Sequence, residues 1–380
     1  MSITSRIPVL ALLFSGLLGT DIAARELPHS CARPDQVAVK HLHLDLSVNF
    51  EEKRLAGAAT LTIERRDKAA KELRLDTRGL DIEAVTCGDA ELDWALGEDD
   101  AQLGKALTIT LPKEDSASSN RIKIEYATRP SAEALQWLTP EQTTDKKHPF
   151  LFTQSQAILA RTWVPCQDTP AVRITYSAKI GVPPELMAVM SASNPQEKNA
   201  SGVYEFKMEQ PIPSYLLALA VGDLQFRSLG PRSGVYCEPS VLKRAEWELA
   251  DTERMIEAAE KLYGKYRWDR YDVIFLPSSF PFGGMENPRL TFATPTILAG
   301  DRSLVALIAH ELAHSWSGNL VTNSTWNDFW LNEGFTVYFE QRIMEAIFGR
   351  QYSEMLARLT LDGLLAEIKE LDERDTWLKL

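Results

Sequence analysis

The sequence has few cysteines, a deficit of positive charge and no apolar run long enough to cross a bilayer comfortably. Its 380 residues include four cysteines, and no two of these have zinc-finger or redox-pair spacing. The net charge is −12 and no Lys/Arg-rich stripe alternates with aromatic residues, so we expect no nucleic-acid partner. With 44% hydrophobic and 25% charged residues, the composition predicts a folded globular protein of about two domains.

One apolar run, IPVLALLFSGLL at 7–18, follows Arg6 near the N-terminus. A transmembrane helix needs about 20 apolar residues, so this run is too short for comfortable spanning and is typical of a signal peptide. Ala23 and Ala24 offer an imperfect cleavage site. We therefore expect residues 1–24 to be a signal peptide and the chain to be exported, periplasmic or secreted, with no stable membrane insertion after cleavage. An uncleaved anchor is the alternative.

Short runs of alternating apolar and polar residues fill the first part of the chain, beginning with HLHLDLSVNF at 41–50. Such alternation predicts half-buried strands. Further runs occur at 59–63, 106–111, 121–126, 173–180 and 214–221, separated by turn residues. We therefore predict an all-β domain over residues 32–224.

The pattern changes near Glu246, where apolar residues recur every three or four positions and predict a helix over 247–266. A buried strand at 272–276, a Pro/Gly-rich loop at 277–288 and two helices at about 302–317 and 328–348 are expected to follow. The predicted fold class is thus multi-domain, all-β and then α+β, with the second domain over residues 225–380.

The helix expected at 302–317, with Asp301 as its N-cap, contains His310, Glu311 and His314 in the pattern H-E-x-x-H. Because a helix turns every 3.6 residues, the two imidazoles project from one face and can converge on one metal ion. Glu311 lies beside them, where its natural role is that of a base. Two unrelated surface histidines are the alternative reading.

A catalytic zinc needs a third protein ligand and one open position. Glu333, nineteen residues after His314 on the next predicted helix, fits this role, and Glu340 two turns later could orient a histidine. The ligand types favour one Zn²⁺ per chain, with cobalt or manganese as alternatives. Zinc would activate water and Glu311 would accept its proton, which predicts peptide or amide hydrolysis.

The segment HELAHSWSGNLVTNSTWNDFWLNEG at 310–334 resembles the zinc segment of the zinc aminopeptidase family M1, the aminopeptidase N and leukotriene A4 hydrolase family. The likeness is greatest to the leukotriene A4 hydrolase and aminopeptidase B branch. Supporting motifs stand in order at 150–157, 165–176, 211–224 and 280–292, so the resemblance covers roughly residues 36–380.

This resemblance implies a saddle-like all-β domain followed by a thermolysin-like catalytic domain. It also implies that the substrates are peptides with a free N-terminus, whose α-amine is held by Glu286. The family's cleft-lining segments correspond here to Pro281, Phe282, Gly283, Gly284 and Met285, and to Gln154, Ser155 and Gln156 of the β-domain. The function that follows is a zinc-dependent metalloaminopeptidase.

Two departures from the family pattern affect this expectation. Phe282 stands where the branch usually has tyrosine, which removes a hydroxyl from the first pocket. The family's transition-state tyrosine and C-terminal helical domain would lie beyond Leu380, so we expect a C-terminally truncated member, and losing one oxyanion donor commonly costs about 100- to 1000-fold in rate. Epoxide hydrolysis of the leukotriene A4 hydrolase type, thermolysin-like endopeptidase activity and an inactive zinc-binding fragment are the alternatives.

Overall fold

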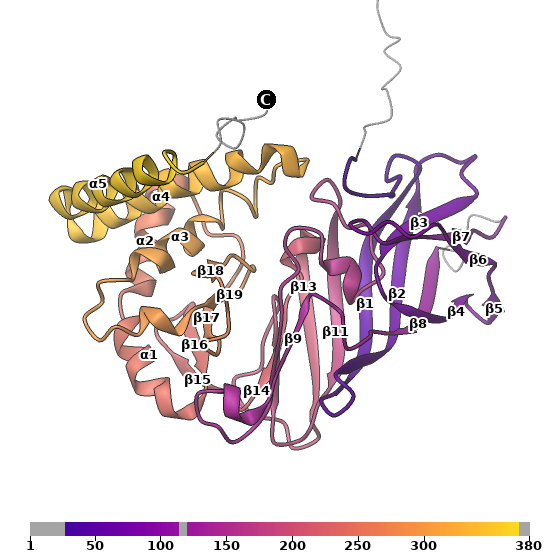
Figure 1. The fold of residues 1–380 in the computed structure, drawn as a ribbon, viewed down its shortest axis with the longest axis horizontal. Helices are drawn as coiled ribbons and strands as arrows, with labels where there is room; N and C mark the ends of the chain where they lie inside the picture. Colours follow the sequence, from indigo (N-terminus) through magenta and orange to yellow (C-terminus); the bar gives the residue numbers. More distant parts are fainter. Residues whose placement is uncertain (1–26, 114–119, 372–380) are drawn as a thin grey trace, which may run out of the picture.

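The computed structural model describes residues 27–113 and 120–371 as a β-rich N-terminal half followed by a half that contains all five described α-helices. Figure 1 shows the two halves side by side, with the helices gathered in the C-terminal one. The predicted fold class is confirmed. The domain bounds at 32, 224 and 225 stay predictions, and the predicted signal peptide lies outside the described residues. Among the described helices, none combines the length and hydrophobicity needed to cross a bilayer.

The largest sheet has seven strands, and its central strand β1 pairs in parallel with β11 and antiparallel with β2. The predicted alternation is confirmed in β1, where Leu42, Leu44 and Leu46 are buried while His41 and His43 on the other face are half-buried. In spatial order the strands are β13 (Val203–Pro213), β11 (Arg173–Gly181), β1 (Val37–Asn49), β2 (Arg54–Arg65), β8 (Arg121–Ala127), β4 (Asp81–Cys87) and β5 (Ala90–Glu91).

Two smaller sheets complete the β-rich half. They are β3 (Glu72–Thr77), β7 (Lys105–Thr110) and β6 (Trp94–Leu96), and then β12 (Met187–Met190), β14 (Leu219–Gly222), β10 (Phe150–Thr153) and β9 (Leu135–Leu138). The prediction of a strand over 214–221 is wrong in its first part, because residues 214–216 form a 3-10 turn and the strand starts at Leu219. Ser214 donates a hydrogen bond to Asp168 at 2.7 Å, and this buried contact fixes the turn.

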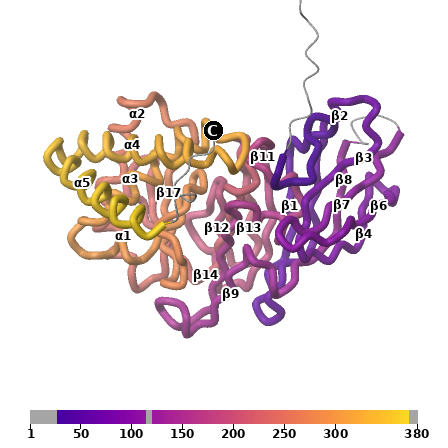
Figure 2. The backbone as a smooth tube through the Cα atoms, turned by 45° about the horizontal axis from the view of Figure 1, so that its top comes forward, coloured from indigo at the N-terminus to yellow at the C-terminus, as the bar shows by residue number. Residues whose placement is uncertain are grey.

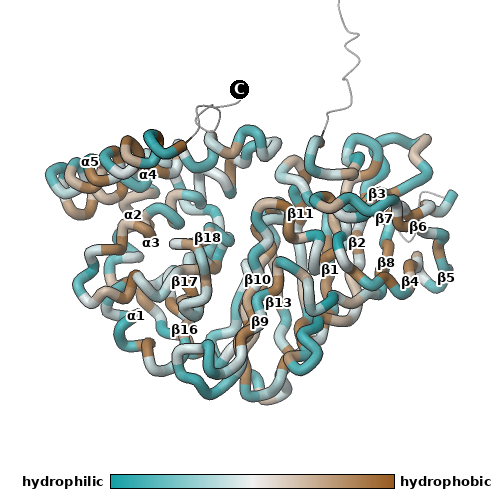
Figure 3. Tube along the Cα trace, viewed as in Figure 1, coloured by the Kyte–Doolittle hydropathy of each residue, from teal (hydrophilic) through white to brown (hydrophobic). Residues whose placement is uncertain are grey.

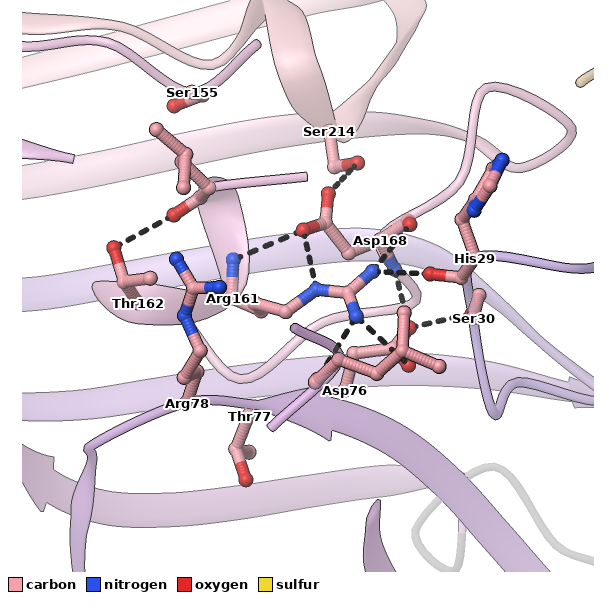
Figure 4. A network of polar contacts seen from close by, with 12 residues as sticks. His29, Ser30, Asp76, Thr77, Arg78, Ser155, Arg161, Thr162, Asp168 and Ser214 are labelled. Atoms are coloured by element: carbon pink, nitrogen blue, oxygen red, sulfur yellow. Dashed lines mark hydrogen bonds and ion pairs between the residues drawn. The ribbon is translucent and has the colours of Figure 1, made fainter. Parts of the chain in front are cut away.

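A buried charge network joins the first described residues to this half (Figure 4). The Arg161 side chain is fully buried and its Nε lies 2.9 Å from a carboxylate oxygen of Asp168. Arg161 also donates to the carbonyl of His29 at 2.6 Å, and Asp76 accepts from the Ser30 hydroxyl at 2.5 Å. Since buried charges must be paired to be tolerated, this network is a stability determinant of the β-rich half.

The C-terminal half is built on a five-stranded sheet with helices packed against it. The strand order is β15 (Gln225–Ser228), β16 (Ser233–Cys237), β17 (Tyr271–Phe275), β19 (Leu290–Ala293) and β18 (Gly284–Met285). The helices are α1 (Leu242–Glu248), α2 (Thr252–Tyr263), α3 (Ala306–Ala313), α4 (Phe329–Phe348) and α5 (Arg350–Glu367). Short 3-10 turns occur at Pro140–Gln142, Ala160–Thr162, Ser214–Leu216, Pro239–Val241, Pro295–Ile297 and Trp326–Asp328.

The predicted helices are close to those found, with three differences. The helix expected over 247–266 is two helices, α1 and α2, separated at residues 249–251. The helix α3 begins at Ala306 rather than next to Asp301, because the Asp301 carboxylate accepts from the backbone N–H of Ser303 at 2.9 Å and caps an isolated turn. Helix α5 was not predicted. Figures 1 and 2 show α4 beside α3, with α5 outside it.

Exposed apolar side chains gather on one part of the C-terminal half. Of the large apolar residues that are exposed in the described ranges, most lie between residues 320 and 371, and Figure 3 shows the hydrophobic segments along α4 and α5. A hollow of about 530 Å³ opens there between Tyr263, Trp316 and Phe335. The exposed residues of this region are Leu320, Val321, Leu331, Phe335, Tyr338, Phe348, Met355, Leu359, Leu361, Leu364, Leu365, Ile368 and Leu371.

Candidate metal centre

Helices α3 and α4 pack against each other and bring the predicted metal ligands His310, His314 and Glu333 together. The two imidazole Nε2 atoms are 3.2 Å apart, and Glu333 Oε2 lies 3.3 Å from His310 Nε2 and 3.7 Å from His314 Nε2. A tetrahedral ion with bonds of about 2.0–2.1 Å holds its ligand atoms roughly 3.3 Å apart. The three atoms therefore have the spacing of one face of a tetrahedral metal site.

The other ring nitrogen of each histidine is held by a neighbour. His310 Nδ1 lies 3.1 Å from Glu340 Oε2, which is the contact predicted for Glu340. His314 Nδ1 lies 3.1 Å from both the carbonyl of Ser317 and the hydroxyl of Thr336. Such partners fix the ring orientation and leave Nε2 free to face an ion.

The charges around the cluster favour a cation. Burial acts to lower the pKa of His310, but hydrogen bonds to the Glu333 and Glu340 carboxylates outweigh it and raise this pKa to about 10. Burial and the neighbouring His310 lower the pKa of His314 to about 4. Burial acts to raise the pKa of Glu333, yet the two histidines hold it below its ordinary value. An ionised carboxylate, a neutral imidazole and a second imidazole between carboxylates form a donor set that fits a divalent metal.

Glu311 is buried next to this cluster, and its carboxylate points toward strand β18. A Cβ placed on Gly284 would lie 2.2 Å from Glu311 Oε1, so only glycine leaves room for the carboxylate. The other oxygen, Oε2, has no hydrogen-bond partner among the described residues. Burial raises the pKa of Glu311 well above its ordinary value, which is a property expected of a base.

Glu286 follows strand β18 and is also buried, with its Oε1 unpartnered within the described ranges. Its backbone carbonyl accepts from the Asn319 side chain at 2.7 Å. Ligand atoms of Glu286, Glu311 and His314 lie within 4.8 Å of one another, a second trio that could hold a metal. We favour the first trio, because two imidazoles and a carboxylate suit zinc better than one imidazole and two carboxylates. Glu286 then faces the site as a carboxyl group that is not a metal ligand, and burial raises its pKa to about 7.

The glycine-rich loop forms one edge of the site. Gly284 and Met285 make up β18, the edge strand of the five-stranded sheet, so backbone groups on one side have no strand partner in that sheet. The preceding loop residues are exposed: Pro281, Phe282, of which 50% of the surface is accessible, and Gly283. An extended peptide could pair with such an edge.

The three residues predicted from the β-rich half differ in where they point. The Gln154 side-chain nitrogen lies 3.2 Å from the sulfur of Met285, so Gln154 reaches the glycine loop. The Ser155 hydroxyl instead donates to the carbonyl of Leu217 at 2.8 Å and accepts from the Trp163 indole at 3.1 Å, which occupies it within the β-rich half. Gln156 is half-buried and is the first residue of the turn over 156–159.

Several residues that position the site were not predicted from the sequence. Arg173 on β11 donates to the carbonyl of Asn319 at 2.7 Å and contacts Thr322, so it ties the loop after α3 to the β-rich half. Asn332, next to Glu333, is buried on α4 and its carbonyl accepts from Ser317 at 3.1 Å. Asn332 could have been predicted from its position directly before the third ligand. The contact of Arg173 with Asn319 could not, because it depends on the path of the loop after α3.

The fold and the cluster define a class: an all-β domain followed by a helical domain with a two-histidine, one-glutamate metal centre of the metallopeptidase type. Models of the Peptidase M1 N-terminal domain and of the Peptidase family M1 domain match residues 38–216 and 247–375. The chain belongs to peptidase family M1. Solved members include zinc metallopeptidases, so the family implies zinc for this centre.

Similar proteins are found in several organisms. A leukotriene A-4 hydrolase from Xenopus laevis is 46% identical over 87% of this chain and 55% of its own length. A leucine aminopeptidase 2 from Yarrowia lipolytica is 48% identical over 85% of this chain and 50% of its own length. The structure of yeast LTA4 hydrolase in complex with bestatin matches with a TM-score of 0.86 and 40% identity, over 93% of this chain and 55% of that one. The chain spans about half the length of the curated relatives it matches.

Proposed function

We propose that the chain carries the active site of a zinc-dependent aminopeptidase, with one zinc per chain held by His310, His314 and Glu333. The observation that supports this most is Glu286: a buried carboxylate with an unpartnered oxygen, placed at an edge strand beside the metal cluster. An unpaired buried carboxylate is costly unless a cation joins it. The α-ammonium group of a peptide is such a cation.

Each residue then has a distinct role. His310, His314 and Glu333 would hold zinc, which would act as a Lewis acid that polarises the scissile carbonyl and lowers the pKa of water. Glu311 accepts the proton of the attacking water and delivers it to the leaving nitrogen. Glu286 binds the ammonium group, and the backbone of β18 pairs with the extended substrate. Glu340 and Thr336 keep the two imidazoles oriented.

The proposed substrates are peptides with a free N-terminus. The exposed ring of Phe282 and the side chain of Met285 at the cleft favour an apolar first residue, and similar proteins named leucine aminopeptidase 2 support this choice. Epoxide hydrolysis is the competing proposal, because other similar proteins bear the name leukotriene A-4 hydrolase. Both activities would use the same metal.

The test is hydrolysis of leucine p-nitroanilide by the zinc-loaded 380-residue chain, beside its N-acetylated analogue as the matched substrate. We expect cleavage of the free-amine substrate only, with loss of the rate on chelation and in Glu311→Gln. Equal cleavage of both substrates would refute the role of Glu286 and favour endopeptidase action. One bound zinc per chain with no turnover of any substrate, including an epoxide, would mean that activity requires parts of the longer relatives that these 380 residues do not match.

A further inference from the structure

A second pair of histidines lies far from the metal centre. The sequence has six histidines, and four of them occur as two closely spaced pairs, His310 with His314 and His41 with His43. Side chains two residues apart on a strand project from the same face, so His41 and His43 stand side by side on β1. Figure 1 shows β1 and α3 in opposite halves of the molecule.

The two imidazoles of this second pair share one hydroxyl. His41 Nε2 lies 3.1 Å from the Ser177 Oγ, and His43 Nδ1 lies 2.8 Å from the same atom. The two ring nitrogens are therefore less than about 6 Å apart, the sum of these two contacts. His41 Nδ1 is occupied by the hydroxyl of Thr175 at 2.7 Å, which fixes the ring with Nε2 toward the Ser177 hydroxyl that His43 also contacts. This is the arrangement of oriented imidazoles that metal sites use.

The surroundings are open and contain carboxylates. Both histidines are half-buried, and each borders a hollow in the face of the seven-stranded sheet, of about 570 Å³ beside His41 and about 430 Å³ beside His43. Glu205 and Glu209 line the first hollow, and Asp45, Glu83 and Glu125 line the second. The two lysines that line these hollows are each paired with a carboxylate, Lys207 with Glu209 at 2.5 Å and Lys123 with Glu125 at 2.6 Å, which reduces their opposition to a cation.

We propose that His41 and His43 form a second metal site, which binds a divalent cation of the imidazole-preferring class such as Zn²⁺, Ni²⁺ or Cu²⁺. A tetrahedral ion with bonds of about 2.0–2.1 Å requires the two nitrogens to stand roughly 3.3 Å apart, so metal binding would draw them together in place of their shared contact with Ser177. Burial, His43 and Arg121 lower the pKa of His41, so its ring is neutral at pH 7 and available to a metal. With two protein ligands instead of three, this site is the weaker of the two.

The first test is calorimetric titration of the metal-stripped 380-residue chain with Zn²⁺. We expect two equivalents in the parent chain, the weaker of which is lost or at least tenfold weakened in His43→Gln. His148→Gln is the matched control for removing a histidine, and Ser177→Ala keeps both imidazoles while removing their shared hydroxyl; both variants should retain two equivalents. A single equivalent in the parent chain, or an unchanged second equivalent in His43→Gln, would overturn the proposal.

The second test needs no substitution. Diethyl pyrocarbonate acylates accessible neutral imidazoles, and mass spectrometry of the digested parent chain reports the modified fraction of each histidine. Saturating Zn²⁺ should lower the modification of the peptide that contains His41 and His43 at least several-fold, and leave His148 unchanged. Equal modification of the His41 and His43 peptide with and without Zn²⁺ would contradict a metal at this position.

Discussion

Gly284→Ala should inactivate the proposed enzyme while leaving metal binding intact. The new Cβ would lie 2.2 Å from Glu311 Oε1, 2.4 Å from its Cδ and 2.7 Å from its Cγ. Cβ contacts in proteins are essentially never shorter than 3.0 Å, so the Glu311 carboxylate has to move by roughly 1 Å. None of the three atoms that face the metal belongs to Glu311, so the cluster of His310, His314 and Glu333 has no reason to change.

The magnitude follows from the displacement of the base. A misplacement of about 1 Å in catalytic geometry can cost about 100-fold in rate. We therefore expect kcat for leucine p-nitroanilide to fall by about 100-fold with the zinc content near one per chain at the three-ligand centre. The KM should change little, because Glu286 and the backbone of β18 remain in place.

Gly283→Ala is the matched control, since it makes the same chemical change one residue earlier. The atoms nearest to its Cβ would belong to the Leu307 side chain, the first at 3.2 Å, and the end of a leucine can move by a few tenths of an ångström. We expect less than about a threefold change in kcat for this variant. A Gly284→Ala protein with parental kcat, or equal losses in the two variants, would refute the placement of Glu311 against β18.

Three further predictions concern stability and association. Asp168→Asn leaves the buried Arg161 guanidinium without its close carboxylate, and urea denaturation should show a loss of about 3–5 kcal/mol; a loss below 1 kcal/mol would contradict a buried pair. In the metal-free chain, burial raises the pKa of Glu286 from 4.5 to about 7, so the neutral acid is the form that the fold favours. The contribution of this group to the free energy of unfolding is therefore complete below pH 4.5 and falls by up to about 3 kcal/mol as the pH rises through 7. The free energy of unfolding at pH 5 and pH 8 should therefore differ less in Glu286→Gln than in the parent, and equal differences would rule this out. The exposed apolar side chains of α5 are expected to cause self-association that light scattering can measure. Replacing Leu359 and Leu364 together by lysine should lower it, and unchanged association would exclude this face.

The strands of the β-rich half could be predicted because apolar and polar residues alternate along them. This pattern is visible in a short stretch of sequence, and it arises because one face of each strand is buried. In β1, Leu42 and Leu44 had to face a core, and the pattern fixed which face that would be. The errors occur where a polar contact between distant residues decides the backbone. The chain turns at Ser214 because its hydroxyl donates a hydrogen bond to the Asp168 carboxylate, and no local sequence pattern contains that partner.

Helix α5 was missed for a related reason. Most of its leucines, among them Leu359, Leu361 and Leu364, are exposed, while the polar Ser353 is buried on it. A helix is recognised in a sequence from a stripe of apolar residues that faces a core. In α5, among the described residues, the apolar positions are mostly not the buried ones. The packing of this helix could therefore not be predicted from the sequence.

The metal cluster was predictable to a greater extent than the groups that support it. His310 and His314 face one way because of the helical repeat, and a returning helix is enough to bring Glu333 to them. Arg173 and Asn319 could not be assigned in the same way. Their contact depends on how the loop after α3 runs against β11, which is a property of the whole fold.

In the proposed function, two carboxylates of the site bind two different cations, the metal ion and the α-ammonium group of the substrate. The half-buried Glu333 would bind the metal and the buried Glu286 would bind the substrate ammonium, so each carboxylate has its own cationic partner. Asn319 holds the carbonyl of Glu286 at 2.7 Å and lies on the loop that follows the metal helix. This hydrogen bond links the residue proposed to bind the amine to the loop that follows the metal helix, so it helps to set the separation between the bound amine and the metal. A substrate anchored by its amine can then present only its first peptide bond to the metal, which is the physical basis for cleavage at the N-terminus.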